Sequence, residues 1–358
     1  MRILSALLTG CLIWLAACTP EATDALVGTD TSELLYLRHQ GADMPVLIEG
    51  NTASKTFVVV VHGGPGGNAL IYNHFSTNMS DPLEDRYALV YWDQRGSGNA
   101  SGSYNTDVLT PAQYVEDLDR LVDLLYSRYG QDIGIFLMGH SWGGTLTAAY
   151  LIDTTRQARI RGWIEVDGAH DFLLINRTTP GLLIQYGQQQ IAEDNNTTKW
   201  EKIVEYCQEL PAADQLTFEQ VIQVNRYANE VEAYLLSAGV TATPETDLGG
   251  TLDFFFGSGH NFVSASFNTL LTAGIMSRDL VFSSYSDSLY RIIIPSLFLW
   301  GRHDLVVPVV LGEDAYARVS TPELDKRLVI FEESGHSPML NQVTPFVAEV
   351  IDFVEQHR

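Results

Sequence analysis

The stretch IFLMGHSWGGT, residues 135–145, runs from an apolar strand directly into a Gly-His-Ser-Trp-Gly turn and a helix of small residues. Glycines on both sides of a serine let two chain segments pass close together at a sharp strand-to-helix turn. Such a turn exposes the serine hydroxyl above the end of the sheet. The pattern therefore predicts a nucleophile elbow, with Ser141 as the nucleophile.

A serine hydroxyl needs a base that takes its proton, and the base needs a carboxylate that orients it. Two later strand-like runs end in suitable residues. SLFLWGRHD presents Asp304, and LVIFEESGH presents His336. The order serine, aspartate, histidine is the one expected for this kind of elbow. We predict that His336 is the general base and then the acid, and that Asp304 fixes its tautomer and stabilises the imidazolium.

Other residues could take these roles, and the sequence leaves them open. His140 adjoins the nucleophile and should point elsewhere. Asp167 ends the strand before the predicted cap and rivals Asp304, because a carboxylate there can also reach the histidine. Three further histidines stand in loops of unknown orientation: His62, His260 and His303.

A second decisive stretch is VVVVHGGPGG, residues 58–67, in which a buried strand ends in a glycine-rich loop. Attack on a carbonyl creates an oxyanion, and each fixed amide donor aimed at it contributes roughly 3 kcal/mol. We predict that the backbone amides of Gly64 and Trp142 form the oxyanion hole, and that Gly63 shapes the turn. A merely flexible loop would not need Pro65 in its middle.

The run YWDQRGSG, residues 91–98, follows the next core strand. We predict that Asp93 and Arg95 brace the glycine loop through an ion pair or a hydrogen-bond network. A direct part in the chemistry is the less favoured alternative.

Alternating strand and helix patterns predict an α/β fold with a mostly parallel, eight-stranded sheet that helices cover on both faces. The clearest helix spans Thr110–Tyr129, and a final helix is expected from Pro345 with Thr344 as its cap. Helical patterns such as Thr217–Ala238 replace the alternation after the sixth core strand, which predicts an inserted cap. The predicted division is a core over 33–167, a helical cap over 168–290 and the rest of the core over 291–358.

The N-terminus reads as an export signal over residues 1–17, with one basic residue and an apolar stretch too short to span a bilayer comfortably. Its end, Leu-Ala-Ala-Cys, is typical of a bacterial lipobox, which predicts lipidation of Cys18 and a polar tether over 18–32. The mature protein would then be held on a membrane surface of the cell envelope, facing the periplasm or the exterior. A plain signal with a chance cysteine is the alternative.

The formal net charge of −23 argues against nucleic-acid binding, because phosphate contacts need clustered lysine and arginine. With 46% hydrophobic and 18% charged residues the chain has the composition of a globular protein, which argues against general disorder. Of the three cysteines only Cys207 lies outside the signal and lipobox. It falls in an amphipathic helical pattern, so we expect a buried structural thiol.

The motifs HGGPGG, DQRGSG, GHSWGG, GRHD and GHS together resemble the proline iminopeptidase branch of the α/β-hydrolase fold. The resemblance covers residues 57–150 and 296–336. It implies a serine hydrolase that cleaves an N-terminal residue, often proline, from short peptides through an acyl-enzyme, without a metal or organic cofactor. In that family, carboxylates of the cap hold the free amine of the substrate.

For the amine site, Glu201 and Glu205 lie one helical turn apart and could form an anionic patch, although a solvated helix face explains them equally well. An esterase or amidase for small acyl compounds is an alternative function, with Phe254, Phe255 and Phe256 lining an apolar pocket. A non-catalytic binding lipoprotein is a third, which the complete set of motifs argues against.

Overall fold

The computed structural model describes residues 31–69, 77–245 and 280–358, together with Tyr72, Asn268, Thr272, 274–276 and Arg278. The predicted signal, Cys18, His260 and the three phenylalanines 254–256 lie outside the described residues. Thr31 and Ser32, expected to end the tether, already belong to the first strand. None of the described helices combines the length and apolar character that a membrane crossing requires.

A nine-stranded sheet forms the centre of the fold, with the order β1-β2-β4-β3-β6-β7-β8-β9 and β5 paired to β2. The strands from β4 to β9 in this order run parallel, and β1, β2 and β5 pair antiparallel. The predicted mostly parallel sheet is confirmed. The ninth strand is β5, whose two residues are too few for a sequence pattern. The bounds are β1 Thr31–His39, β2 Ala42–Gly50, β3 Thr56–Val61, β4 Ala88–Trp92, β5 Ser101–Gly102, β6 Gly134–His140, β7 Gly162–Val166, β8 Ser296–Gly301 and β9 Lys326–Phe331.

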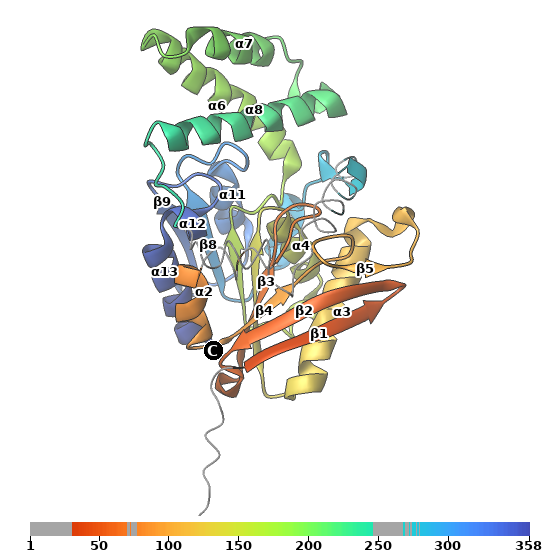
Figure 1. Ribbon diagram of the computed structural model, residues 1–358. Helices are drawn as coiled ribbons and strands as arrows, with labels where there is room; N and C mark the ends of the chain where they lie inside the picture. The colour runs from red at the N-terminus through yellow and green to blue at the C-terminus, as the bar shows by residue number, and fades with distance from the viewer. Residues whose placement is uncertain are drawn as a thin grey trace, which may run out of the picture.

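Helices cover both faces of the sheet, as the valine run of β3 requires (Figure 1). Val59 and Val61 share one core with the helices α3 (Pro111–Tyr129) and α4 (Trp142–Leu151). Val58 and Val60 point the other way, into a core shared with α2 (Thr77–Glu84) and α13 (Val343–His357). Because successive side chains of a strand alternate between faces, an unbroken apolar run is stable only with both faces covered.

Local capping signals place the helix ends with one exception. Thr110 caps α3, and Gly130 follows it with a φ of 101°. The helix α13 begins at Val343 and not at Pro345, and its N-cap is Gln342 and not Thr344. The remaining helices of the core are short: α5 Thr154–Gln157, α11 Val310–Arg318, α12 Pro338–Asn341, and the 3₁₀ turns η1 Thr52–Ser54, η2 Thr106–Val108, η4 Ser286–Arg291 and η5 Glu323–Asp325.

The helical cap follows β7, the sixth core strand when the two-residue β5 is left aside, and lies beyond one end of the sheet (Figure 1). It contains α6 (Phe172–Ala192), α7 (Thr197–Gln208), the turn η3 (Ala213–Gln215) and α8 (Phe218–Ser237). The capping box of Thr217 and Gln220 starts α8, as its sequence indicates. The cap has its own apolar core, in which Cys207 is buried and its pKa raised to about 11 by that burial. A reactive thiol would need the opposite shift.

A buried ionic cluster fixes the point where the chain leaves the core for the cap. His170, just before α6, lies 2.9 Å from Glu165 of β7 and 3.4 Å from Asp314 of α11. Ser286, where the chain returns to the core, donates to Asp314. Burial alone would lower the pKa of His170, but the charge of Glu165 and hydrogen bonds to both carboxylates raise it to about 9. His170 is therefore an imidazolium at neutral pH.

We expect replacement of His170 by glutamine to remove a pH-dependent contribution to stability. A histidine with a raised pKa stabilises the fold fully below its unfolded pKa of about 6.5 and loses this contribution as the pH rises through 9. The wild type should exceed His170→Gln in unfolding free energy at pH 6, and the gap should shrink by about 3 kcal/mol at pH 9.5. Urea unfolding at both pH values measures it, and a constant gap would contradict a charged His170.

Candidate active site

Ser141 lies at the turn between β6 and α4 with φ 54° and ψ −117°, a conformation that L-residues rarely adopt. Its amide donates to Val166 at the end of β7, and its carbonyl accepts from Ala169, both at 3.0 Å. Its side chain makes no hydrogen bond within the described part of the chain. The strained turn thus presents a hydroxyl with no intramolecular partner to the cavity described below.

The two glycines around Ser141 are required by the close passage of neighbouring chain segments. A side chain on Gly143 would overlap the carbonyl of Val61 at the end of β3. A Cβ on Gly139 would lie 2.5 Å from the carbonyl of Gly143 and 2.6 Å from Thr147. The Gly-x-Ser-x-Gly spacing is therefore a packing requirement of the elbow, as its sequence predicts.

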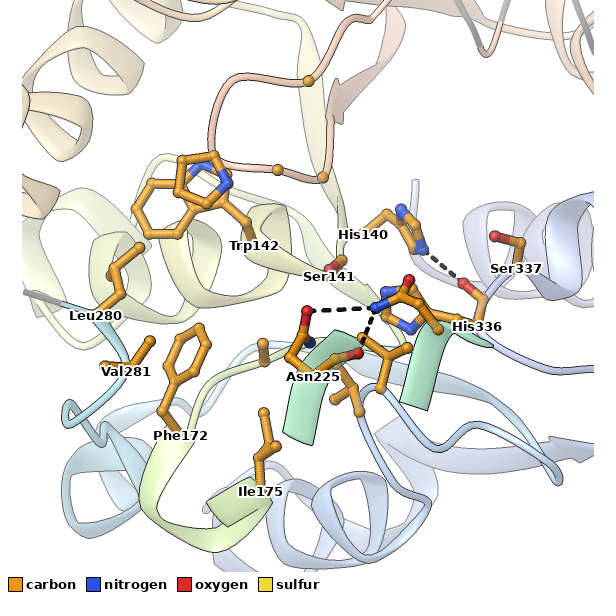
Figure 2. Close-up of a pocket in the computed structure, with 18 of the residues that line it drawn as sticks. His140, Ser141, Trp142, Phe172, Ile175, Asn225, Leu280, Val281, His336 and Ser337 are labelled. Atoms are coloured by element: carbon orange, nitrogen blue, oxygen red, sulfur yellow. Dashed lines mark hydrogen bonds between the residues drawn. The ribbon is translucent and has the colours of Figure 1, made fainter. Parts of the chain in front are cut away.

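His336 and Asp304 meet at the carboxyl ends of β9 and β8. His336 Nδ1 lies 2.8 Å from Asp304 Oδ2, and Asp304 Oδ1 accepts from the Val307 amide at 2.7 Å. Asp304 is 2% exposed, whereas His336 is half-buried. Figure 2 shows His336 beside Ser141. The structure thus brings together the three residues that the sequence singles out, although Ser141 and His336 are not hydrogen-bonded.

The carboxylate of Glu232, from the cap helix α8, links the two loops that carry Asp304 and His336. Its oxygens accept from the amides of Leu305 and His336, each at 3.1 Å. The amide of His303 also donates to Ser334, so the loops are joined by backbone as well. The cap therefore contributes directly to the position of both residues behind Ser141, a contact that the sequence analysis missed.

His140 serves to hold the main chain of His336 and not to act as a base. Burial lowers the pKa of His140 to about 3, so its ring is neutral. His140 Nε2 donates to the carbonyl of His336 at 2.8 Å, and its Nδ1 accepts from the hydroxyl of Tyr72 at 2.8 Å. Tyr72 in turn accepts from the Gly63 amide at 3.5 Å. This chain of hydrogen bonds runs from the glycine loop to the histidine of the site.

The other described loop histidines also have structural partners. His62 is fully buried, which lowers its pKa to about 4; it donates to the Gly63 carbonyl and accepts from the Gln94 amide. His303 Nδ1 lies 2.7 Å from the hydroxyl of Tyr186 in α6. Among the described histidines, His336 is thus the one paired with a buried aspartate and facing Ser141.

The glycine loop lies directly over Ser141. A Cβ on Gly63 would be 3.3 Å from that of Ser141, and Gly64 has a φ of +140°, which favours glycine. Trp142 occupies the first turn of α4, where a helix leaves its amides without an intrahelical acceptor. Gly63, Gly64 and Trp142 all line the same cavity as Ser141. Their placement allows the predicted oxyanion hole, with Gly64 and Trp142 as donors.

Asp93 braces the segment after the glycine loop, whereas Arg95 does not. Asp93 accepts from the amides of Ala69 and Asn99, at 2.9 and 2.7 Å. Burial raises its pKa to about 6, although these two donors favour its charged form. The prediction for Arg95 is wrong: its buried guanidinium binds Asp117 of α3 and the carbonyls of His39 and Gln40. It holds α3 against the β1–β2 turn.

Gln94, between these two residues, is the one that ties the glycine loop to the elbow. Its side chain accepts from the indole of Trp142 at 2.9 Å and donates to the His62 carbonyl at 3.1 Å. Gln94 was not among the residues predicted from the sequence. Its position between Asp93 and Arg95 could have indicated a structural role, but a neutral glutamine does not stand out in a search for charged residues.

A cavity of about 470 Å³ opens over Ser141 and His336 between the core and the cap. Its described walls are mainly apolar (Figure 2). The polar lining residues beside the site are neutral, and no carboxylate lines the cavity among the residues that are described. The apolar wall includes Phe172, Ile175, Val221, Val224, Leu280, Val281 and Val306, and the amides are Asn68, Asn176, Asn225 and Asn229.

Glu201 and Glu205 do not reach this cavity. Both are exposed on α7, whose buried face is formed by Trp200, Ile203 and Val204. Their one-turn spacing places them on the solvated side of the helix, so the prediction that they bind substrate is wrong.

Three side chains of the site could in principle approach one metal ion. Single ligand atoms of His140, Asp167 and His336 lie within 4.8 Å of one another. Both ring nitrogens of His140 are already used, and His336 Nδ1 is bound to Asp304. His140 therefore has no ring nitrogen left for an ion in this structure.

Comparison with known proteins assigns the fold. Residues 56–342 match the family described as the alpha/beta hydrolase fold. The chain is 22% identical to the probable aminopeptidase YbaC of Bacillus subtilis (strain 168), over 87% of this chain and 93% of that protein. It is 28% identical to a proline iminopeptidase of Xanthomonas citri, over 80% and 85% of the two chains. The structure of a proline iminopeptidase from Mycobacterium smegmatis aligns with a TM-score of 0.60 at 17% identity, covering 91% of this chain and 98% of that one.

We expect Glu232→Ala to slow the reaction of Ser141 with a fluorophosphonate by about tenfold or more, because small displacements of aligned groups cost large factors in rate. Two amides lose their acceptor, and the loops of Asp304 and His336 lose their link to α8. Glu230→Ala, on the exposed face of the same helix, is the matched control and should react like the wild type. Equal rates for both variants would show that Glu232 does not position the site.

Proposed function

This chain belongs to the α/β-hydrolase fold family, and we propose that it is a serine hydrolase that works through an acyl-enzyme intermediate. One observation carries the proposal: a serine on a strained elbow faces the same cavity as a histidine whose far nitrogen is bound to a buried aspartate. These are the parts that acyl transfer requires in that order.

In the proposed reaction each group has a role that its position supports. His336 Nε2 takes the proton of Ser141 as the oxygen attacks the carbonyl carbon, and Asp304 stabilises the imidazolium that results. The proton then passes to the leaving group as the bond breaks and the acyl-serine forms. Water, activated by the neutral His336, attacks the acyl group, and the acid is released with Ser141 restored.

The carbonyl oxygen carries the negative charge at each tetrahedral stage. Gly64 and Trp142 would donate their amides to it, and each such donor contributes roughly 3 kcal/mol in a dry site. Gln94 keeps these donors in register, because one amide side chain binds both the loop and the Trp142 indole.

We propose an aminopeptidase similar to proline iminopeptidases as the specific activity. The support comes from the motifs, which resemble that family, and from relatives named as aminopeptidase and proline iminopeptidase that align over most of both chains. A cavity of about 470 Å³ beneath a cap accommodates a short peptide.

A second candidate, an esterase or amidase for small acyl compounds, is favoured by the cavity wall. A free amine needs a carboxylate or several acceptors, whereas the described wall offers apolar groups and neutral amides. Among the described carboxylates of the cap, Glu232 is hydrogen-bonded to the loops of the site, but both its oxygens already accept hydrogen bonds from backbone amides.

We expect a fluorophosphonate probe to label the wild type at Ser141 and to leave Ser141→Ala unlabelled, because only an activated serine reacts. Ser337, which also lines the cavity, provides the control, since Ser337→Ala should label normally. Intact, folded wild type that resists the probe would overturn the hydrolase and favour a binding protein.

The substrate class follows from one matched comparison. We expect prolyl and other aminoacyl chromogenic amides to be cleaved, and their N-acetylated forms to lose at least tenfold in kcat/KM, because blocking removes the charge that an aminopeptidase binds. Equal turnover of free and blocked substrates, with faster cleavage of short acyl esters, would establish the esterase or amidase.

A further inference from the structure

Asp167 is a second carboxyl group behind His336 that the mechanism above does not use. It follows β7, which lies between the strand of Ser141 and the strand that leads to Asp304. Its side chain is 0% exposed, and its backbone φ of +43° is unusual for a residue with a side chain. A buried, strained acid at the carboxyl edge of the sheet is costly unless its surroundings hold it.

The hydrogen bonds of the two aspartates differ in a way that favours a proton on Asp167. Asp304 accepts on both oxygens, from Val307 and His336. Asp167 accepts on Oδ1 from the Gly301 amide at 2.9 Å, while its buried Oδ2 has no donor in the described structure. A carboxylate that accepts several donors is favoured in its charged form, and one with an unmatched buried oxygen is favoured as the acid.

The electrostatics agree with this division. Burial raises the pKa of Asp167 well above its usual range, and the charge of Asp304 raises it further. The pKa of Asp304 is also raised, by burial first and then by the charge of Glu232, but the Val307 amide and a hydrogen bond from Asp167 favour its ionised form. Two neighbouring buried carboxyls do not both ionise.

Asp167 is also within reach of the imidazole. One of its oxygens and one ring nitrogen each of His140 and His336 lie within 4.8 Å of one another. His140 is neutral, and both its ring nitrogens are already hydrogen-bonded. Of these two histidines, His336 is therefore the one whose imidazolium Asp167 can stabilise. The carboxylate of Glu232 accepts a hydrogen bond from the main-chain amide of His336 and not from its imidazole.

We propose that Asp167 is a positioning residue of the triad. As a protonated acid it donates a hydrogen bond to Asp304, and it replaces Asp304 as the partner of His336 when Asp304 is lost. The inference rests on the proposed serine hydrolase. In the intact enzyme, the pair carries one negative charge and one proton, and Asp304 faces the imidazole. In Asp304→Asn, the charge of Asp304 no longer opposes a charge on Asp167, so Asp167 ionises and accepts from His336 Nδ1.

A double-mutant cycle tests this with kcat/KM and with the rate of fluorophosphonate labelling, each followed from pH 5 to 9. Loss of the sole triad acid costs about 10⁴-fold in known serine enzymes. We expect Asp304→Asn to lose only 10- to 100-fold, Asp167→Asn less than about threefold, and the double variant about 10⁴-fold. In Asp304→Asn the acidic limb of the pH profile should also shift upward, because the second acid must first lose its proton.

The control is Glu230→Gln, an exposed carboxylate of α8 that pairs with Lys199. Added to Asp304→Asn, it should leave the remaining activity unchanged. If Asp304→Asn alone falls to the level of the double variant while its folding transition is intact, Asp167 has no such role. Ser141→Ala separates the two proposals: labelling that persists in it, or is absent from the wild type, overturns the serine hydrolase itself.

Discussion

The structure depends on one close backbone crossing, where the start of α4 passes the end of β3 at Gly143. No side chain fits there, because a Cβ would overlap the Val61 carbonyl. The crossing forces the turn that strains Ser141, and it also places the loop after β3 directly above the serine. Ser141 and the glycine loop therefore come together as two results of one packing constraint, and the hydrogen bonds of Gln94 then fix their relative position.

The cap helps to position the residues of the site and does not merely enclose the cavity. Tyr186 and Thr179 of α6 and Glu232 of α8 all bond to the loop that carries Asp304, and Glu232 also binds the amide of His336. Each of these contacts joins residues far apart in the chain. The relative position of Asp304 and His336 thus depends on contacts with the inserted helices, which couples the folding and docking of the cap to the geometry of the site.

The fold and the central residues could be read from the sequence because their signals are local. Each signal can be recognised within about ten residues of sequence. These signals are an apolar run that ends in Gly-x-Ser-x-Gly, a glycine-rich loop after a valine strand, and acids and histidines at strand ends. The partners of long side chains carry no such signal. Arg95 lies two residues after Asp93 but is hydrogen-bonded to Asp117, and Glu232 is hydrogen-bonded to the amide of His336, 104 positions away in the chain. Glu201 and Glu205 show the reverse error, since acids at helical spacing look alike on a solvated face and in a pocket.

The cavity draws its walls from two sources with different duties. Ser141, Asp304 and His336 belong to the loops at the edge of the sheet, whereas the inserted helices contribute Asn176, Val221 and Asn225 to the cavity wall. Substitutions at these three cap positions leave in place the contacts of Thr179, Tyr186 and Glu232 with the loops of the site. Substitution of cavity-lining residues in the inserted segment can therefore change which molecule fits the cavity while the arrangement of Ser141, Asp304 and His336 stays constant, and a scaffold divided in this way lends itself to diversification.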